Sequence, residues 1–399
     1  MTRIDVPDGS PFGIANLPYG VFSTPGAGPR VGVRVGDSVV DLAVALDDDV
    51  FARPSLNAFM AQGPRRWAET RERITELVQG DVPDAAVADA SEITLHLPFE
   101  VGDYVDFYAS EHHASNLGRL FRPDSEPLMP NWKHLPVGYH GRAGTVVVSG
   151  TDIVRPCGQR KTPADPAPVF GPSRRLDIEA ELGFVVGVGS PLGRPIPCED
   201  FAEHVFGAVL VNDWSARDIQ AWEYVPLGPF LGKSFATSVS PWVVPLAALE
   251  HARTATPPQQ PEPLPYLREK EPWGLDIEMA VSWNGQVVSR PPYRTMYWSP
   301  AQMLAHMTVN GASARTGDLF ASGTVSGPEK DQRGAFIELT WGGREPLRVN
   351  GEERTFLEDG DEVAIAATAP GPDGSRIGFG EVRGRILPAS CAPGNERAG

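Results

Sequence analysis

The chain is poor in cysteine, with three residues in 399. Cys157, Cys198 and Cys391 lie far apart in the sequence, and no two of them stand in C-x-x-C spacing. Cysteine zinc sites and redox motifs use such spacing, and small disulfide frameworks use an even number of cysteines. The sequence therefore predicts neither a zinc site nor a disulfide framework, and it favours a reducing, cytoplasmic setting.

Positive charge and long apolar runs are also scarce. Lys and Arg total 35 against 51 Asp and Glu, for a formal net charge of −16. Nucleic acids and anionic membranes both attract basic surfaces, so we expect neither as a partner. No apolar run approaches the roughly 18 residues that cross a bilayer. Residues 1–20 lack the apolar stretch of a signal peptide, and no P-loop or dinucleotide-binding glycine motif is present.

Glycine and proline are abundant, with 42 and 40 residues. They are scattered without a period, which is typical of a loop-rich β protein. Residues 1–98 are predicted to be a separate unit, a small β-barrel or sheet with helices. In it, two strands flank the Gly36–Asp37 turn, and Gly63–Pro64 divides a helical pattern. Residues 99–399 are predicted to be a mainly β domain, with a hairpin at Asn284–Gly285.

Residues 176–182, with the sequence LDIEAEL, alternate apolar and acidic side chains. A period of two predicts a half-buried strand with Asp177, Glu179 and Glu181 on one face, neighbours lying roughly 7 Å apart. Adjacent carboxylates raise each other's pKa unless a positive charge lies between them, and a hard divalent cation is the usual solution. A solvated strand face explains the same pattern, so this segment alone leaves both interpretations open.

A second group follows the apolar run 207–211, which predicts a strand buried on both faces. We expect a helix next, capped at Asp213 or the asparagine before it. Four polar side chains recur at spacings of four, three and four, as on one helix face: Asp213, Arg217, Gln220 and Tyr224. An acid, a cation, an amide and a phenol stand where an ordinary helix buries aliphatic groups, so we interpret this face as functional.

Three further segments favour chemistry over packing. Residues 226–237 form a loop punctuated by glycine and proline that presents Lys233. Residues 130–142 are too rich in proline and glycine for regular structure, and such loops commonly carry function. Glu338 lies among apolar neighbours in a predicted strand, 335–340.

With these motifs in hand, the chain resembles the fumarylacetoacetase (fumarylacetoacetate hydrolase) family. The shared motifs are DWSARDIQ at 213–220, YVPLGPFLGKSF at 224–235, DFY at 106–108, HLPVGYHGR at 134–142 and ASGT at 321–324. The resemblance implies an SH3-like N-terminal barrel, a C-terminal β-sandwich roll and a homodimer. It also implies hydrolysis of 4-fumarylacetoacetate to fumarate and acetoacetate, the last step of tyrosine and phenylalanine breakdown.

The resemblance further implies roles for individual residues. A divalent ion, Ca²⁺ or Mg²⁺, is held by four carboxylates, those of Asp106, Glu179, Glu181 and Asp213. A second, structural cation involves Asp213, Lys233 and Thr237. The general base is His113, oriented by Glu338, and the oxyanion pocket consists of Arg217, Gln220 and Lys233. Substrate is bound by Tyr108, Arg122, Tyr139, Gln220, Tyr224 and Thr324.

The chain departs from the family pattern in two places. Glu111 and His112 precede His113 where the animal enzymes have a basic residue and an amide, so two histidines compete for the role of base. In an extended segment adjacent side chains point to opposite faces, so only one of the two histidines can face Asp106. Ala236 replaces a glycine near the second cation.

The implied reaction explains why these residue types are needed. Hydrolysis of a carbon–carbon bond requires a stabilised carbanion as leaving group, which a cation can supply. An imidazole backed by a carboxylate is a natural base for water, and each preorganised oxyanion donor is worth about 3–4 kcal/mol. Two alternatives stay open. One is another metal-dependent oxo-acid hydrolase, decarboxylase or hydratase of the same superfamily, and the other is a calcium-stabilised binding module without turnover.

Overall fold

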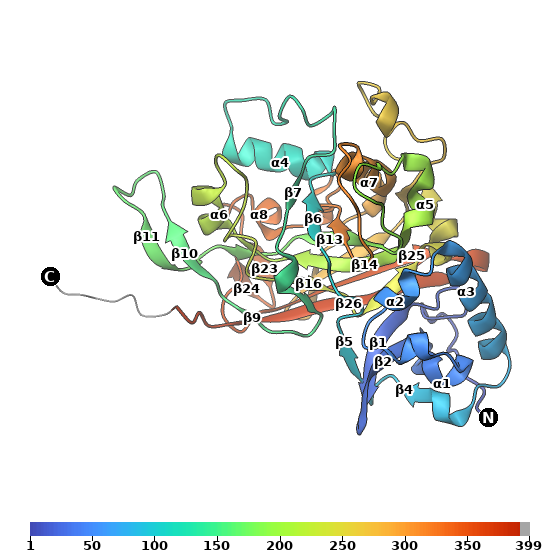
Figure 1. The fold of residues 1–399 in the computed structure, drawn as a ribbon. Coiled ribbons are helices and arrows are strands. Elements are labelled where there is room, and N and C mark those ends of the chain that lie inside the picture. The colour runs from blue at the N-terminus through green and yellow to red at the C-terminus, as the bar shows by residue number, and fades with distance from the viewer. Residues whose placement is uncertain (392–399) are drawn as a thin grey trace.

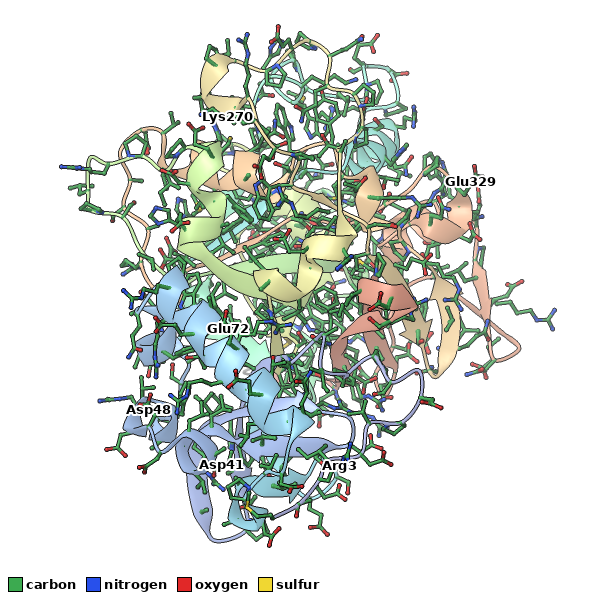
Figure 2. The ribbon with its side chains drawn as sticks, turned by 90° about the vertical axis from the view of Figure 1, so that its right-hand side faces the viewer. Arg3, Asp41, Asp48, Glu72, Lys270 and Glu329 are labelled. Atoms are coloured by element: carbon green, nitrogen blue, oxygen red, sulfur yellow. A yellow bond between two sulfur atoms is a disulfide. The ribbon has the colours of Figure 1, made fainter. Side chains whose placement is uncertain are left out.

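A computed structural model describes residues 1–391, so residues 392–399 of the predicted second domain lie outside it (Figure 1). The N-terminal unit is an antiparallel sheet with helices packed on it, and Figure 2 shows α3, which carries Glu72, along its outer side. The predicted turn at Gly36–Asp37 and the predicted break of the helical pattern at Gly63–Pro64 are both confirmed. The elements are β1 (Tyr19–Thr24), β2 (Ala27–Val35), β3 (Ser38–Asp41), α1 (Leu42–Leu46), α2 (Asn57–Met60), α3 (Pro64–Gln79), β4 (Val87–Asp89) and β5 (Thr94–His96).

In residues 99–391, strands make up most of the regular structure. Five α-helices lie between them: α4 (Glu111–Phe121), α5 (Phe201–His204), α6 (Arg217–Glu223), α7 (Pro300–Thr308) and α8 (Phe336–Leu339). The strands up to the first long pair are β6 (Tyr104–Phe107), β7 (Gly138–His140), β8 (Val146–Val148), β9 (Ile153–Val154), β10 (Cys157–Arg160), β11 (Val169–Pro172), β12 (Leu176–Asp177), β13 (Ala180–Val186) and β14 (Val205–Asp213). Those that follow are β15 (Ser215–Ala216), β16 (Thr237–Val239), β17 (Trp242–Pro245), β18 (Arg253–Thr254), β19 (Gly274–Leu275), β20 (Glu278–Trp283), β21 (Gln286–Ser289), β22 (Leu319–Ala321), β23 (Leu347–Val349), β24 (Glu352–Arg354), β25 (Glu362–Pro370) and β26 (Arg376–Leu387).

One large sheet joins the two parts of the chain. Its order is β4-β3-β2-β1-β17-β14-β13-β22-β6-β7, so the N-terminal strands continue into the C-terminal ones through the pairing of β1 with β17. Most pairs are antiparallel, whereas β22 pairs with β6 and β16 with β8 in parallel. The mainly β architecture, an N-terminal strand unit with helices followed by a sheet-rich C-terminal domain, is therefore confirmed.

A second sheet, β21-β20-β25-β26-β9, packs across the first. β25 alternates buried and more exposed residues along its length, as a strand with one face on a core does. The predicted hairpin of β20 and β21 turns at Asn284–Gly285, where both residues have positive φ, at 49° and 80°, as a type I′ turn requires. Ser299 caps α7 with Gln302 in a capping box, as the Ser-Pro start predicts.

β13 and β14 are buried along their whole length because both faces are covered. On β14, Val209 and Val211 pack into the core of the N-terminal unit, whereas Ala208 and Leu210 pack into the core of the C-terminal domain. The prediction of a half-buried strand at 176–182 is therefore wrong. The chain also breaks there, between β12 and β13, so that the alternation is not one continuous strand.

The cysteine prediction needs a correction as well. Cys157 on β10 and Cys391 beyond β26 form a disulfide with a Cα–Cα distance of 5.9 Å, while Cys198 is a buried free thiol. The two cysteines are 234 residues apart in sequence, and the neighbouring pairing of β26 with β9 brings them together. Within residues 1–391, no helix is long and apolar enough to cross a membrane.

Candidate active site

Four buried carboxylates gather where neighbouring strands end. Asp106 lies on β6, Glu181 on β13 and Asp213 at the end of β14, and Glu179 directly precedes β13. Because β6, β22, β13 and β14 are consecutive in the large sheet, their side chains meet, and one oxygen from each acid lies within 4.8 Å of the others. The predicted ligand set is thus brought together, and Asp177 is not part of it.

This cluster holds more negative charge than its surroundings balance. Neither oxygen of Glu181, nor Oδ1 of Asp106, has a hydrogen-bond partner among the described residues. Burial, followed by repulsion from Asp106 and Asp213, raises the pKa of Glu181 well above its usual range. Burial and the charge of Asp213 do the same to the pKa of Asp106.

Two cations lie against the other side of the cluster. Lys233 donates from Nζ to Glu179 Oε2 and Asp213 Oδ2, each at 2.5 Å. Arg217 Nη1 lies 2.7 Å from Glu179 Oε1. Burial alone would raise the pKa of Glu179, but Lys233 and Arg217 hold it well below its usual range. Asp213 and Glu179 outweigh burial at Lys233 and raise the pKa of its ammonium, so Lys233 acts as a hydrogen-bond donor and not as a base.

The donor set fits a hard divalent cation. The three unpartnered atoms of the four acids are carboxylate oxygens, the ligands that Ca²⁺ and Mg²⁺ prefer. Burying an unpaired carboxylate costs several kcal/mol, and a cation among these oxygens removes that cost. The family resemblance and the geometry thus point to the same four ligands.

A second site for a cation has weaker support. Thr237 Oγ1 donates to Asp213 Oδ1 at 3.3 Å, and Lys233 lies next to both residues. The protonated Lys233 ammonium has no lone pair, so its Nζ cannot ligate a cation. Of the three predicted residues, Asp213 and Thr237 offer side-chain oxygen there, beside a cavity of about 320 Å³.

His113 is fully buried and bonded to Glu338. Its Nδ1 lies 2.6 Å from Glu338 Oε2, and its Nε2 is 3.9 Å from Glu179 Oε1. The segment is not extended as expected, because Ser110 accepts from the backbone N–H of His113 and caps α4. On this helix His113 faces the cluster, whereas His112 is half-buried beside it and its imidazole has no hydrogen-bond partner within residues 1–391.

Glu338 lies on a helix, not on the predicted strand. It belongs to the short helix α8 and is completely buried. Asn116 donates to its Oε1 and Ser326 to its Oε2, each at 2.9 Å. Burial would raise the pKa of Glu338, but His113 and these two donors lower it, so the carboxylate is charged and accepts the Nδ1 proton of His113. Sequence reasoning missed Asn116 and Ser326. The position of Asn116 three residues after His113, on the same helix face, was an available signal.

The helix at Arg217 begins later than predicted. β14 runs through Asp213, which pairs with Thr237 on β16, and α6 starts only at Arg217. Arg217 and Gln220 still share a helix face, since Arg217 Nη1 donates to Gln220 Oε1 at 3.2 Å. Figure 1 shows α4, α6 and α8 around the end of β13 that lies away from the N-terminal unit.

A cavity of about 460 Å³ opens over the carboxylates. His113, Lys233 and Glu179 line it, whereas Arg217 and Glu338 lie behind its wall. The outer part of the cavity is lined by apolar side chains, which include Leu117 and Phe121. All six predicted substrate-binding residues line it: Tyr108, Arg122, Tyr139, Gln220, Tyr224 and Thr324.

Comparison with known proteins decides the family. Residues 104–387 match the family described as "Fumarylacetoacetate (FAA) hydrolase C-terminal", and residues 15–98 match "Fumarylacetoacetase N-terminal". The chain belongs to the fumarylacetoacetase family.

Curated relatives span nearly its whole length. The chain is 49% identical to the human fumarylacetoacetase over 418 aligned residues, covering 98% of this chain and 99% of that protein. The Caenorhabditis elegans and Arabidopsis thaliana fumarylacetoacetases are 48% and 46% identical, each covering 97% of this chain and 99% or 98% of their own length.

Solved structures share the fold at much lower identity. A fumarylacetoacetate hydrolase from Exiguobacterium antarcticum gives a TM-score of 0.59 at 18% identity, covering 94% of this chain and all of that one. A maleylpyruvate hydrolase from Sphingobium gives 0.54 at 17% identity with the same coverage. These two likenesses concern the fold alone.

The charge imbalance makes a prediction for Glu181→Gln. Adding a divalent cation should raise the melting temperature of the wild type, and a chelator should reverse it, whereas the variant should respond to neither. With chelator present, the variant should be no less stable to unfolding than the wild type, because the glutamine amide carries no charge that must be buried. Thermal melts with elemental analysis measure both effects.

Asp361→Asn provides the control. Asp361 is a buried acid whose two oxygens accept from Asn284 and from the backbone of Glu358. This variant should be less stable by about 1–3 kcal/mol and keep the full response to the cation. A Glu181→Gln protein that retains its metal would contradict the ligand assignment.

Proposed function

We propose that this protein hydrolyses the carbon–carbon bond of 4-fumarylacetoacetate, giving fumarate and acetoacetate. The observation that carries the proposal is the meeting, at one cavity, of a buried His–Glu pair with four carboxylates whose charge exceeds that of the two cations beside them. Near-full-length relatives at 45–49% identity that are fumarylacetoacetases support the same reaction.

His113 is the proposed base. Glu338 accepts the proton on Nδ1, which leaves Nε2 as the acceptor that faces the cavity and takes a proton from water. The carboxylate also stabilises the imidazolium that results, so proton transfer is favoured on both counts. The water then attacks the carbonyl carbon of the fumaryl group, and the bond from this carbon to the neighbouring methylene breaks, so that fumarate forms and acetoacetate leaves as a carbanion that is then protonated.

The proposed oxyanion donors are Gln220 and Lys233, which line the cavity. Arg217 is placed to act on them, because its donation to Gln220 Oε1 leaves the amide nitrogen of Gln220 free to face the substrate. The raised pKa of Lys233 keeps it positively charged throughout. Donors fixed before the reaction lower the barrier without reorganising during it.

A bound divalent cation would be held by Asp106, Glu179, Glu181 and Asp213, and it would polarise the diketone oxygens and stabilise the departing carbanion. Ca²⁺ and Mg²⁺ both suit a site made only of oxygen. As a further proposal, a second cation lies at Asp213 and Thr237 beside Lys233.

Arg122 and the tyrosines would hold the substrate. Arg122 donates from Nη2 to the Pro127 carbonyl, which fixes the side chain, and its Nε has no partner among the described residues. A guanidinium that is held in place and still has an N–H donor without a partner can bind a terminal carboxylate of the substrate. Tyr139 donates to Asp213 at 3.1 Å, and Tyr108, Tyr224 and Thr324 complete the polar wall.

Several finer points remain proposals. We propose a role in tyrosine and phenylalanine breakdown and a domain boundary near residue 98. We also propose a homodimer, which the exposed apolar side chains of Val225, Leu227 and Phe230 beside the cavity support.

The cytoplasm stays our proposed compartment, although the Cys157–Cys391 disulfide weakens the argument from cysteine count, since disulfides are rare in reducing compartments.

The alternatives are not favoured. A decarboxylase or hydratase of the same superfamily would need a likeness to such enzymes, whereas the near-full-length relatives are fumarylacetoacetases. If the protein were a binding module without turnover, the buried His113–Glu338 pair would have no role.

The activity itself is the first prediction. Purified protein should remove the diketone absorbance of fumarylacetoacetate, and a chelator should abolish the loss until Ca²⁺ or Mg²⁺ is returned. Spectrophotometry follows the reaction, with product identity checked by chromatography. Equal rates with and without chelator would exclude the cation from the mechanism, and a stable absorbance in all conditions would exclude the function.

The two histidines give the second prediction. His113→Ala should lose several orders of magnitude in kcat while still binding metal, because no other base faces the water. His112→Ala, its matched neighbour on α4, should stay within about tenfold of wild type, a barrier change of about 1.4 kcal/mol. Steady-state kinetics on both variants provides the measurement, and the reverse ranking would show that the wrong histidine has been assigned.

A further inference from the structure

Asp177 is a buried acid that no part of the proposed mechanism uses. It ends β12, is 0% exposed and accepts four hydrogen bonds. Its Oδ1 accepts from the backbone N–H groups of Ile178 at 2.8 Å and Phe336 at 2.7 Å. Its Oδ2 accepts from the N–H of Ile337 at 3.0 Å and from Arg217 Nε at 2.8 Å. Four donors occupy the acceptor positions of a carboxylate, so Asp177 has none left for a metal.

One pair of these bonds fixes the start of α8. Phe336 and Ile337 are its first two residues, whose N–H groups have no partner within the helix. Asp177, far away in sequence, satisfies both. The next residue along is Glu338, which holds His113. The position of the base is therefore set through Asp177.

The other bond fixes the start of α6. With Nε held by Asp177, the guanidinium of Arg217 presents Nη1 to Glu179 and to Gln220. Arg217 is the first residue of α6, so the same contact also anchors the first turn of this helix. The orientation of the oxyanion donor Gln220 thus depends on the same carboxylate as that of the base.

We propose that Asp177 is a positioning residue that joins the two halves of the active site, holding the His113–Glu338 pair and the Arg217–Gln220 pair at a fixed separation. This inference rests on the proposed function for its catalytic consequence. The carboxylate is needed because an amide in its place would present an N–H₂ group to two of the four donors. A shift of the catalytic groups by about 1 Å can cost about 10²-fold in rate.

Asp177→Asn tests the proposal, and the chain offers a close control. Asp41, on the N-terminal unit (Figure 2), is also buried, caps a short helix through two N–H groups and pairs with an arginine, Arg30. Asp177→Asn should lower kcat about 10²-fold with little change in KM, because the contacts matter in the transition state. Asp41→Asn should lose stability and keep kcat. Equal kcat in the two variants would overturn the proposal.

A readout without substrate separates this proposal from the function. The Nδ1 proton of His113, shared with a buried carboxylate, should give a far-downfield proton resonance that Glu338→Gln abolishes. Asp177→Asn should shift or broaden it, and Asp41→Asn should not. If the wild type does not hydrolyse fumarylacetoacetate, the proposed function fails, but this resonance still tests the positioning. A resonance unchanged in Asp177→Asn would overturn the proposal.

One measurement on the unchanged protein covers the case in which Asp177→Asn does not fold. The amides of Phe336 and Ile337 should exchange with solvent as slowly as those in β13 and β14, although α8 is only one turn long. Fast exchange at both amides would show that Asp177 does not hold α8, and would overturn the proposal.

Discussion

The structure depends on an excess of buried negative charge. Four carboxylates lie together under an apolar cavity, and the cations against them, Lys233 and Arg217, contact mainly Glu179 and Asp213. Glu181 and one oxygen of Asp106 remain without partners among the described residues. Such a cluster is costly unless a cation completes it, and the same cation would do the chemistry that the cavity needs. Folding stability and catalysis therefore both require a cation at this site.

The fold buries these carboxylates by covering a sheet on both faces. β13 and β14 are shared between two cores, because β1 of the N-terminal unit joins the sheet through β17 while the second sheet packs on the other side. This burial removes the carboxylates from bulk solvent and strengthens every electrostatic contact around them. The three helices α4, α6 and α8 then bring the base and the donors from distant parts of the sequence to the end of β13.

Local signals predicted local structure. The Asn284–Gly285 turn and the Ser299–Pro300 helix start were predictable because the residues that cause them are adjacent. Elements that depend on residues far away in the sequence could not be predicted. α8 is capped by Asp177, 159 residues before its first residue. α6 starts late because Asp213 pairs with Thr237. The Cys157–Cys391 disulfide depends on strand pairing. The roles of the site residues came from motif resemblance, since period and spacing singled out the Arg217 helix face and Lys233 but left the acidic segment ambiguous.

The most direct test of this account is a crystal of the protein grown with Mn²⁺, whose anomalous scattering locates the ion. The account predicts the strongest anomalous peak among Asp106, Glu179, Glu181 and Asp213, within ligand distance of the Glu181 oxygens that lack partners. An empty cluster, with Mn²⁺ bound elsewhere or not at all, would contradict the claim that this charge is built to hold a metal.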